Sequence, residues 1–490
     1  MRLADLLAGT DAIEVRGDLD VEVIDVAYDS RRAGPGSVFV AMRGERADGN
    51  DFVPEAVRNG ATAIVSEREA VFDTAWVRVA SPRVALADLA ARFFGYPTRE
   101  LCLVGITGTN GKTTTAHLVE AILGADGKSA ALIGTIGHRG PGFRDQASLT
   151  TPEAPDLERW FRGTVEAGGT HAVMEVSSHA IAMKRVWGLE FDAAVFTNLS
   201  GEHLDFHGGM EEYFATKRQV FGGFGAPPPG LAVVNRDDAY GERLLDCGNE
   251  KVMTFGLDPG ADVLPLNAEL DWNGIRARFR TPRGDLDVSS GLLGRLNLLN
   301  VAAAVAVCVG LGIRDDAIRS GIRALHGVPG RFERVDRGQA FAVIVDYAHT
   351  DDALMKLLTA AREITPGRLL LVFGAGGERD TSKRRRMGQV AGRHSDLAIV
   401  TSDNPRGEDP ARISRMIEEG LERESGDYSS IPDRRSAIRE ALRGARPGDT
   451  VVIAGKGHED YQIVGTERLG FDDRDVAREL LDELDAGRDR

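Results

Sequence analysis

One glycine-rich segment constrains this chain more than any other, and it reads Gly105-Ile-Thr-Gly-Thr-Asn-Gly-Lys-Thr-Thr-Thr115. It lies between an apolar run at residues 101–106 and an amphipathic pattern that predicts a helix from near Thr113. Glycines allow successive N–H groups to face one phosphate, and a helix N-terminus adds its positive end. Ile106 stands where the usual G-x-x-x-x-G-K-[ST] spacing has its first glycine. The sequence nevertheless predicts a strand, a phosphate-binding loop and a helix.

The side chains of this loop have expected roles toward ATP. Lys112 can reach the β- and γ-phosphates, and the Thr113 hydroxyl can bind Mg²⁺. A purely structural glycine-rich turn is the alternative, and the attached Gly-Lys-Thr-Thr argues against it. We therefore expect ATP to be bound by Gly108, Thr109, Asn110, Gly111, Lys112, Thr113 and Thr114.

Strand-like and helical patterns alternate along most of the chain, which is typical of α/β folds. A length of 490 residues exceeds what one hydrophobic core usually serves, so about three domains are expected. A linker-like segment at 94–98 and a turn-rich segment at 327–332 suggest where they divide. We predict a smaller N-terminal α/β domain (1–98), a central P-loop-type doubly wound, mostly parallel sheet (99–328) and a C-terminal Rossmann-like α/β domain (329–490).

Short continuous apolar runs predict strands that are buried on both faces. In the N-terminal part they lie at residues 38–42 and 63–66. Further along they lie at 101–106, 172–176, 193–196, 232–235, 342–345, 369–373, 397–400 and 451–454.

Charge and composition narrow the class of protein. The formal net charge is −15 without a long basic run, which disfavours a nucleic-acid binder. No stretch of about 18 apolar residues predicts a membrane span, and the N-terminus has no signal-peptide core. Three cysteines do not make a disulfide framework. We therefore expect a cytoplasmic protein, with no nucleic-acid partner and no membrane insertion.

The phosphate loop, Thr107-Gly-Thr-Asn-Gly-Lys-Thr-Thr114, resembles that of the Mur ligases and of the related folylpolyglutamate synthases. Mur ligases build the peptide stem of bacterial cell-wall precursors, and further segments resemble the members that add its third residue. In the N-terminal part these are Asp29-Ser-Arg31 and Pro35-Gly-Ser-Val-Phe-Val40. In the central part they are Thr150-Thr-Pro152, Glu175-Val-Ser-Ser-His179, Thr197-Asn-Leu199 and His203-Leu-Asp-Phe-His-Gly208. In the C-terminal part they are Asp346-Tyr-Ala-His-Thr350, Gly376-Gly-Glu-Arg-Asp380, Asp403-Asn-Pro-Arg406 and Gly455-Lys-Gly-His-Glu459.

The resemblance implies an ATP- and Mg²⁺-dependent ligase that forms an amide bond through an acyl phosphate. It implies that meso-diaminopimelate is added to the D-Glu γ-carboxylate of UDP-MurNAc-L-Ala-D-Glu, by an enzyme expected to be a monomer. The same reaction with L-lysine or L-ornithine, and a folylpolyglutamate synthase-like activity, are the alternatives. A catalytically silent, nucleotide-binding relative is a third, and the presence of Lys112, Glu175, His203 and Lys217 argues against it.

Oxygen ligands for Mg²⁺ are the first requirement of this chemistry. Thr113 is one candidate, and Glu175 is another because a carboxylate at the end of an apolar strand is costly without a cation. A structural carboxylate is the alternative for Glu175. By resemblance, His203 and Lys217 help to hold a second Mg²⁺, with Lys217 carbamylated to N6-carboxylysine. Taken alone, these two residues would be a loop histidine and a surface lysine.

The nucleotide and the uridine-linked substrate are assigned further residues by resemblance. Asn297 and Asn300 look like the segment that binds the base, and Arg331 and Asp346 would reach ATP from the C-terminal domain, Arg331 with a catalytic role. The uridine-linked substrate would be held by Ser30, Thr150, Thr151, Ser177, Ser178 and Arg185. Departures from the family pattern are Met183 for Gln, Glu202 for Asp, Asn50 for His, Leu296 for Phe and Asp351 for Pro.

The added amino acid is expected at Asp403-Asn-Pro-Arg406, which follows the strand predicted at 397–400. Open α/β sheets bind ligands at this end of their strands. The resemblance associates this motif with meso-diaminopimelate, whose distal carboxylate suits a bidentate arginine. An ordinary Asx turn is the alternative. The residues expected to bind diaminopimelate are Arg379, Asp403, Asn404, Pro405, Arg406, Gly455 and Glu459.

Overall fold

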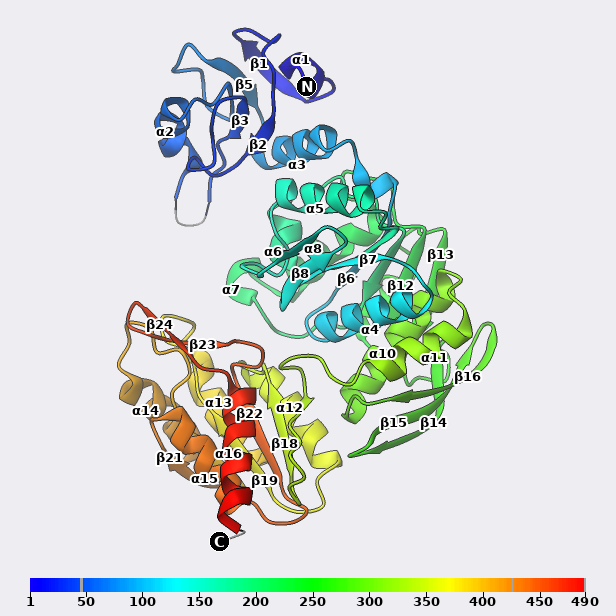
Figure 1. Cartoon of the computed structure of the whole chain (residues 1–490), viewed down its shortest axis with the longest axis vertical. Helices are drawn as coiled ribbons and strands as arrows, with labels where there is room; N and C mark the ends of the chain where they lie inside the picture. The colour runs from blue at the N-terminus through cyan, green and yellow to red at the C-terminus, as the bar shows by residue number, and fades with distance from the viewer. Residues whose placement is uncertain (45–46, 425, 489–490) are drawn as a thin grey trace. The chain divides into compact units, whose positions relative to one another are not determined.

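The structure is a computed structural model that describes residues 1–44, 47–424 and 426–488. The chain divides into two compact units, one made of Met1–Asp262 and Ala303–Ile318, the other of Val263–Ala302 and Arg319–Arg490 (Figure 1). The predicted domain boundaries at residues 98 and 328 divide the chain differently and stay predictions.

The first unit opens with a five-stranded sheet of order β1-β5-β4-β3-β2, in which only β1 pairs antiparallel. The strands predicted at 38–42 and 63–66 are present as β3 (Ser37–Val40) and β4 (Ala63–Ser66). Helix α3 (Pro82–Phe93) begins where the Ser81 side chain accepts a hydrogen bond from the Val84 N–H. The other elements here are α1 (Leu3–Leu6), β1 (Ala12–Arg16), β2 (Asp25–Ala27), the 3₁₀ helix Gly49–Phe52, α2 (Val53–Arg58), β5 (Ala75–Val79) and the 3₁₀ helix Pro97–Arg99.

An eight-stranded sheet forms the rest of this unit, in the order β13-β12-β11-β6-β10-β7-β8-β9. It is parallel from β13 to β7, and β8 and β9 extend it antiparallel. The first strand along the chain, β6, thus lies inside the sheet, where the strand order reverses. The strands are β6 (Cys102–Thr107), β7 (Ala130–Gly134), β8 (Gly137–Gly140), β9 (Phe143–Asp145), β10 (His171–Glu175), β11 (Ala193–Phe196), β12 (Leu231–Asn235) and β13 (Lys251–Phe255). The helices are α4 (Lys112–Ala125), α5 (Ala154–Glu166), α6 (Ser178–Ala182), α7 (Leu204–His207), α8 (Met210–Gly222), α9 (Ala239–Glu242), α10 (Gly294–Gly310), which passes into this unit from the second one, and α11 (Asp315–Ala324), which leaves it.

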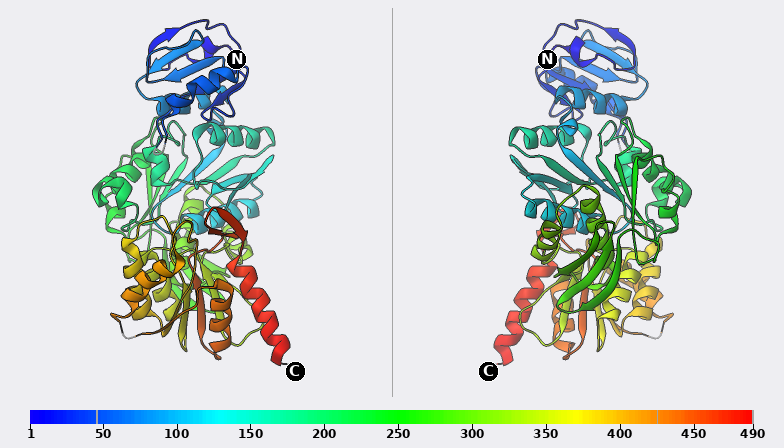
Figure 2. Two further views of the ribbon diagram at one scale, coloured as in Figure 1. Left: turned by 90° about the vertical axis from the view of Figure 1, so that its left-hand side faces the viewer. Right: turned by 90° about the vertical axis from the view of Figure 1, so that its right-hand side faces the viewer.

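The second unit contains a three-stranded antiparallel sheet and a six-stranded sheet of order β17-β18-β22-β19-β20-β21. In the six-stranded sheet only β17 pairs antiparallel. Its last helix, α16, packs on α15, as Figure 2 shows. The strands are β14 (Leu264–Asp271), β15 (Gly274–Thr281), β16 (Gly284–Ser290), β17 (Glu333–Arg334), β18 (Ala342–Asp346), β19 (Leu369–Phe373), β20 (Leu397–Val400), β21 (Asp427–Ser430), β22 (Thr450–Ala454), β23 (Tyr461–Val464) and β24 (Glu467–Gly470). The helices are α12 (Asp351–Glu363), α13 (Ser382–His394), α14 (Pro410–Leu421), α15 (Arg434–Gly444) and α16 (Asp473–Arg488).

Both large sheets are built from apolar runs that are buried on both faces. Every residue of β12, β19 and β22 is buried, which a parallel sheet covered by helices requires. The α/β class and the strands predicted from residue 101 onward are therefore confirmed. The carboxyl ends of the parallel strands gather polar loops at one edge of each sheet, and the candidate sites lie there.

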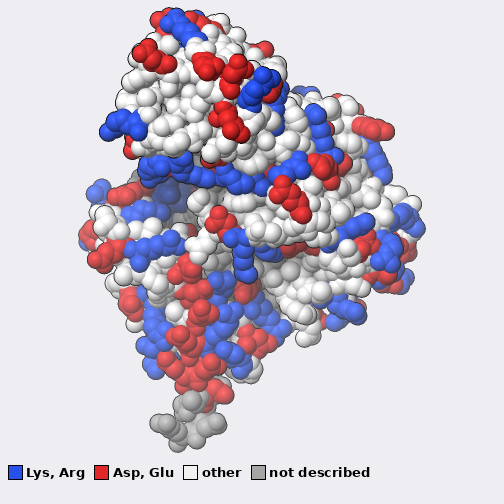
Figure 3. Space-filling model, turned by 45° about the horizontal axis from the view of Figure 1, so that its top comes forward, with Lys and Arg blue, Asp and Glu red and all other residues white. Residues whose placement is uncertain are grey.

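Charged side chains of both signs are spread over the face shown in Figure 3. Among the residues that the structure describes, no helix has the length and apolar character needed to cross a bilayer.

Candidate functional site

The phosphate loop begins directly after β6, where the strand order reverses. Gly108 and Gly111 have φ values of 144° and 89°, which side chains rarely tolerate. A Cβ at Gly108 would lie 1.9 Å from Thr197 Oγ1. Gly105, in contrast, lies inside β6, and a Cβ there would lie 2.5 Å from the Phe191 ring. Gly108 therefore makes the loop turn, and Gly105 serves the packing of the strand.

Neighbouring backbone and side chains hold the loop open in this form. The Asn110 N–H donates to Asn198 Oδ1 at 3.0 Å, and Asn198 Nδ2 donates back to the Asn110 carbonyl at 3.0 Å. Lys112 Nζ donates to the carbonyls of Gly108 and Thr109, at 3.0 and 2.8 Å. The ammonium thus crosses the mouth of its own loop, where a phosphate would meet it.

Two hard oxygen groups, those of Thr113 and Glu175, meet beside the loop. Thr113 Oγ1 donates to Glu175 Oε2 at 3.0 Å, and Glu175 is buried at the end of β10. Thr135 also donates to Glu175, from its N–H at 2.8 Å and from Oγ1 at 3.1 Å. This donor set fits Mg²⁺, which prefers carboxylate and hydroxyl oxygens. Within the described ranges, three His, Cys, Asp or Glu side chains do not converge anywhere as a ready metal site.

Lys217 lies on α8 and is almost completely buried, with 1% of its surface exposed. Its Nζ donates to the Gly108 carbonyl at 2.9 Å and to Thr107 Oγ1 at 3.4 Å. Burial lowers the pKa of Lys217 well below its ordinary value, the positive charge of Lys112 lowers it further, and Glu202 opposes the shift. The structure thus brings Lys217 to the phosphate loop, and it is not the solvated surface lysine that sequence alone would allow.

His203 precedes α7 and adopts a left-handed backbone conformation, with φ 58°. Its ring lies 4.6 Å from the ring of His179, and its Nε2 lies 3.9 Å from Glu202 Oε1. Burial lowers the pKa of His203 to about 4, and His179, Lys112 and Lys217 add to this effect. A neutral imidazole of this kind is suited to bind a metal ion.

Four of the five hydroxyl residues predicted for the uridine-linked substrate lie beside Glu175, and Ser30 lies elsewhere. Thr151 Oγ1 donates to the Glu175 carbonyl at 2.8 Å and lies 3.3 Å from Ser177 Oγ. Thr150 Oγ1 lies 3.1 Å from Thr135 Oγ1, and Ser178 is buried at the start of α6. These four residues are therefore brought together next to the phosphate loop.

Arg185, the predicted anion partner, is engaged by this chain's own groups. Its Nε donates to Glu153 Oε1 at 2.8 Å and its Nη1 to the Thr151 carbonyl at 3.1 Å. Its Nη2 lies 3.3 Å from Met183 Sδ. Met183, the departure from the family pattern, thus contacts the arginine directly.

A pocket of about 580 Å³ opens in the N-terminal part of the first unit. Ser30 lies in its wall and donates to Glu55 Oε2 at 2.6 Å. Arg83 also lines it, and its Nη1 donates to the Met183 carbonyl at 3.3 Å. Arg83 therefore connects this pocket with Met183 and Glu153, both of which contact Arg185. Tyr28, Asp29, Arg31, Phe39, Met42 and Phe52 are among the other lining residues.

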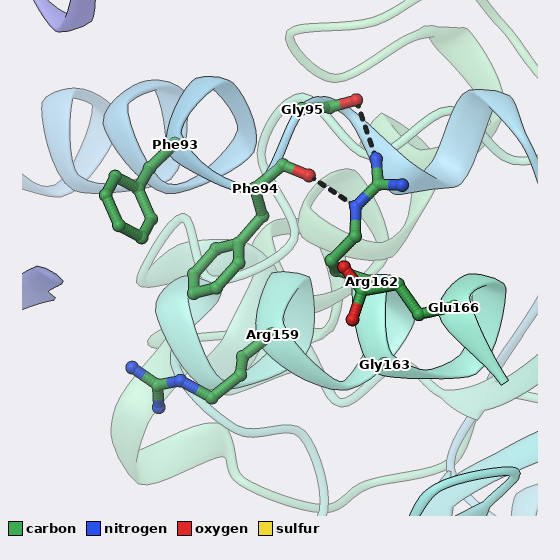
Figure 4. Close-up of a pocket in the computed structure, with 7 residues that line it drawn as sticks. All are labelled: Phe93, Phe94, Gly95, Arg159, Arg162, Gly163 and Glu166. Atoms are coloured by element: carbon green, nitrogen blue, oxygen red, sulfur yellow. Dashed lines mark hydrogen bonds between the residues drawn. The ribbon is translucent and has the colours of Figure 1, made fainter. Parts of the chain in front are cut away.

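A second cavity of about 660 Å³ lies between the end of α3 and the second half of α5 (Figure 4). Arg162 Nε donates there to the Phe94 carbonyl at 2.7 Å, and its Nη2 donates to the Gly95 carbonyl at 3.0 Å. Phe94 and Gly95 lie on the chain that leads into β6, and α5 leads into β10. The cavity therefore lies toward the amino ends of these strands, away from the phosphate loop, and Arg162 serves to fasten the linker.

In the second unit, the loops after β19 and β20 are interlocked. Arg406 has φ 52° and donates from Nη1 to the Gly377 carbonyl at 2.7 Å. A Cβ at Gly376 would lie 3.2 Å from Arg406 Nη1 and 3.8 Å from Arg379 Cγ, so both arginines pass this glycine. The fully buried Arg384 joins the loops, because its two Nη atoms each donate to Glu408 at 2.9 Å. These contacts form a basic end at the carboxyl edge of the sheet.

An acidic end lies beside it, after β20 and β22. Asp403 and Asn404 are buried, and Asn404 Nδ2 donates to Glu459 Oε2 at 2.9 Å. A Cβ at Gly455 would lie 3.3 Å from Asp403 Oδ2, so the glycine leaves room at that carboxylate. Pro405 lies buried between the acidic residues and Arg406. The structure thus gathers all seven residues predicted for diaminopimelate at one edge of the sheet.

Arg331 and Asp346 are also neighbours in this unit. The Phe332 N–H donates to Asp346 Oδ2 at 2.7 Å, and Arg331 lies 4.7 Å from the Tyr347 ring. Burial raises the pKa of Asp346, and the charge of Arg331 opposes this. On α10, Asn297 Nδ2 donates to the Leu293 carbonyl, and Asn300 donates to Asn297. The role of these four residues toward ATP stays a prediction.

Sequence reasoning missed several groups that the geometry places in these sites. Thr135 and Glu153 give no signal of their own, because their partners are distant in sequence. Arg83 lies in an ordinary amphipathic helix. Lys456 lies in the segment Gly455-Lys-Gly-His-Glu459, which resembles the family. A lysine two residues after the apolar strand β22 is a signal that could have identified it.

Comparison with known families matches three segments of the chain to models of one group of enzymes. Residues 23–94 match "Mur ligase family, catalytic domain", residues 106–308 match "Mur ligase middle domain", and residues 330–457 match "Mur ligase, glutamate ligase domain".

Two relatives that match nearly the whole chain share the same name. The chain is 47% identical to the UDP-N-acetylmuramoyl-L-alanyl-D-glutamate--2,6-diaminopimelate ligase of Solibacter usitatus, over 94% of each chain. It is 45% identical to the protein of that name from Geobacter sulfurreducens, over 99% of this chain and all of the relative. A solved structure of a ligase with the same name matches with TM-score 0.72 and 31% identity, over 99% of each chain. Folylpolyglutamate synthase of Mycobacterium tuberculosis, solved with ADP and AMPPCP, matches only 76% of this chain at 19% identity and TM-score 0.60, a likeness of fold alone.

Proposed function

The chain belongs to the Mur ligase family, ATP-dependent ligases that form amide bonds, and from this premise we propose its substrates and the residues that serve each of them. It joins meso-diaminopimelate to the γ-carboxylate of UDP-MurNAc-L-Ala-D-Glu, a step in building peptidoglycan precursors. The relatives from Solibacter usitatus and Geobacter sulfurreducens bear the name of this activity. A cytoplasmic monomer stays the expectation for its state in the cell.

The choice of meso-diaminopimelate rests on one observation, that the site of the second unit has a basic end and an acidic end side by side. We call it the two-ended site. Arg406 and Arg379 pass one glycine at the basic end, while Asp403 and Glu459 stand at the acidic end. The distal head of meso-diaminopimelate has one carboxylate and one ammonium group, and so complements both ends. L-lysine and L-ornithine carry only the ammonium group, which would leave a guanidinium without its anion.

The uridine-linked substrate is placed along the first unit. Its uridine end fits the pocket lined by Ser30, and a cavity of about 580 Å³ is of ligand size. Its peptide end reaches Thr151 and Arg185, because Arg83 at the pocket contacts Met183 and Glu153, which in turn contact Arg185. In this assignment Arg185 exchanges Glu153 for an acidic group of the substrate. The residues assigned to this substrate are Ser30, Thr150, Thr151, Ser177, Ser178 and Arg185.

ATP is assigned to the loop of residues 108–114, with Lys112 over the β- and γ-phosphates. Thr113 and Glu175 would hold one Mg²⁺, and His203 and Lys217 a second; bound there, these ions neutralise phosphate charge. In the reaction an oxygen of the substrate γ-carboxylate bonds to the γ-phosphorus, and ADP leaves. The amine of the amino acid then bonds to the acyl carbon, phosphate leaves with the electron pair of the broken C–O bond, and the nitrogen gives up a proton to solvent. The protein brings two anions, the substrate carboxylate and the γ-phosphate, together among cations. Most of the catalysis of phosphoryl transfer comes from such positioning and electrostatic stabilisation.

Carbamylation is the proposed state of Lys217. A neutral amine can add to CO₂, with its proton leaving to solvent, and the carbamate then offers the oxygen ligands that an amine lacks. The depth of burial of Lys217 and its position against Gly108 support this assignment.

The test is phosphate release by the purified protein with ATP, Mg²⁺ and UDP-MurNAc-L-Ala-D-Glu. The assay would be run in parallel with meso-diaminopimelate, L-lysine, L-ornithine and no amino acid. Release with meso-diaminopimelate alone supports the proposal. Release with lysine or ornithine instead would leave a ligase but overturn the assignment of the two-ended site. Folded protein that releases phosphate with none of them would direct attention to folate substrates or to a silent relative.

A further inference from the structure

Lys456, directly after Gly455 at the end of β22, has no exposed surface. Its Nζ lies 3.2 Å from Asn404 Oδ1, 3.4 Å from Glu459 Oε2 and 3.6 Å from Asp403 Oδ1. The ring of Tyr461 is 5.6 Å away. The ammonium therefore lies between Asp403, Asn404 and Glu459, at the centre of the acidic end.

Lys456 fixes the orientation of the Asn404 amide. Asn404 Oδ1 accepts from Lys456 Nζ and from the Ile463 N–H, the latter at 2.9 Å. Asn404 Nδ2 consequently points to Glu459, as observed. A reversed amide would place its NH₂ group against two donors, so this network has one arrangement. Lys456 thereby also positions the Glu459 carboxylate.

Lys456 also sets the charge of this end. Asp403 and Glu459 face its single positive charge, and the nearby Arg434 is already paired through two 2.7 Å hydrogen bonds with the buried Asp473. These three carboxylates and two cations make two ion pairs and leave one negative charge unbalanced. Asp403 Oδ1 is buried and has no hydrogen bond within the described part of the chain, since Lys456 Nζ stays beyond that range. The acidic end thus has an acceptor for one more cation.

We propose that Lys456 is a positioning residue that sets the net charge of the acidic end. The site thereby selects an amino acid with a zwitterionic distal head over one with a purely cationic end. The proposal rests on the proposed function, because it concerns the same diamino acid site. With Lys456 present, one ammonium group of the ligand balances the acidic end, and its carboxylate is left for the arginines. Without Lys456, two negative charges face the ligand, repel its carboxylate and favour a second cation.

Three amino acids that differ in distal charge test the proposal. L-2-aminopimelate has a distal charge of −1, meso-diaminopimelate of 0 and L-lysine of +1. Their kcat and KM would be measured by phosphate release, or by inhibition where turnover is absent, for the wild type, Lys456→Met and Lys456→Gln. The surface variant Lys356→Met, which breaks an ion pair of Lys356 with Asp352, is the matched control.

In Lys456→Met we expect the loss of positioning at Asn404 and Glu459 to lower kcat/KM about 10-fold even for L-lysine. Repulsion of the distal carboxylate by the unbalanced negative charge should bring the fall to about 100-fold for meso-diaminopimelate and to more for L-2-aminopimelate, which has no distal ammonium group. The loss should lie mainly in the KM for the amino acid, with the KM for ATP unchanged. Lys456→Gln, which keeps a donor toward Asn404 but not the charge, should show the same ranking. Lys356→Met should change none of these values.

An equal loss for all three amino acids would overturn the proposal, because Lys456 would then be only structural. If Lys456→Met does not fold, as judged by circular dichroism and ATP binding, Lys456→Gln decides between the same outcomes. If neither variant folds, the lysine is required for the fold and the proposal is overturned. A wild type that uses no diamino acid at all would instead overturn the proposed function, before any variant is compared.

Discussion

Two lysines among the described residues are buried, and their surroundings are opposite. Lys217 in the first unit donates to a carbonyl and a hydroxyl. The charged neighbour that most affects its pKa is Lys112, which has the same sign. Lys456 in the second unit lies among Asp403, Asn404 and Glu459. Burial is the same, but only one of the two ammonium groups has carboxylates against it.

The difference shows what each position can do. An ammonium group buried without an adequate counter-charge loses its proton, and the resulting amine is a nucleophile. A buried ammonium group inside an acidic cage stays charged and holds its partners in place. Lys217 is thus suited to chemical modification, and Lys456 to positioning.

The largest effect is expected from Lys217→Met. If the side chain supplies ligand oxygens at the phosphate loop, ligase activity should fall about 10⁴-fold, equivalent to about 5.5 kcal/mol. The melting temperature should stay equal or rise, because a buried amine with no carboxylate against it has been removed. Phosphate release and calorimetry on one sample check both outcomes. A large fall in melting temperature would show that Lys217 is structural.

Lys456→Met should have the opposite effect on stability. Removing the one cation between two carboxylates should destabilise the second unit by about 3 kcal/mol. Urea unfolding, followed beside Lys217→Met, measures the contrast directly. If both variants shift the midpoint in the same direction, the comparison between the two lysines fails.

Arg406→Met should weaken the use of meso-diaminopimelate by about 2 kcal/mol, or about 30-fold in kcat/KM, through loss of a charged hydrogen-bond pair. L-lysine has no distal carboxylate, so its kcat/KM should change far less. Steady-state kinetics with both amino acids check this. Arg385→Met, which removes a surface pair with Glu419, is the control.

Glu158 is a further buried titratable group, and among the described residues it has no ion pair, as Lys217 has none. Burial raises the pKa of Glu158 to about 8, and Arg162 only partly opposes this. The folded state then keeps a proton that the unfolded chain releases, so stability should fall as pH rises from about 4.5 to about 8. Glu158→Gln should remove this slope and gain about 1 to 2 kcal/mol at pH 8. Urea midpoints between pH 5 and pH 9 measure it, with Glu166→Gln, on the same helix, as the control; equal slopes in all three proteins would contradict it.

The smallest effect is expected at Met183. Its sulfur is a weak acceptor 3.3 Å from Arg185 Nη2, and a glutamine oxygen would accept more strongly. Met183→Gln should change the KM for the uridine-linked substrate by about 2- to 5-fold, less than 1 kcal/mol, and leave the KM for the amino acid unchanged. Initial rates at varied substrate provide the measurement. A larger change in kcat than in KM would argue that residue 183 touches the reacting groups.

The sequence made some parts of the molecule predictable and left others hidden. Strands such as Leu369–Phe373 could be predicted because buried parallel strands are continuous apolar runs. The phosphate loop could be predicted because backbone geometry demands glycines at fixed spacing, as at Gly108 and Gly111. Motif resemblance singled out Lys217 and Arg406, although nothing in their local pattern sets them apart. The structure shows Lys217 against Gly108 and Arg406 against Gly377, and their roles stay predictions.

Networks of side chains from distant segments could not be predicted. Thr135 reaches Glu175 across 40 positions, and Lys456 reaches Asn404 across 52. Arg384 looks like one member of a basic helical run, yet it is fully buried against Glu408. Such pairs depend on how the strands are ordered in a sheet, and periodicity along the chain carries no information about that order.

The backbone at Arg406 has a consequence for how amino acid preference could change over evolutionary time. Its φ of 52° is held from both sides, because its N–H donates to the Ile463 carbonyl and its carbonyl accepts from the Gly465 N–H. Most replacements there must carry the strain of a left-handed conformation, which glycine, asparagine and aspartate tolerate best. Few residue types can therefore replace Arg406 without strain. A lineage that changes to another diamino acid is limited first by the backbone conformation at this position, and only then by how the new side chain recognises its ligand.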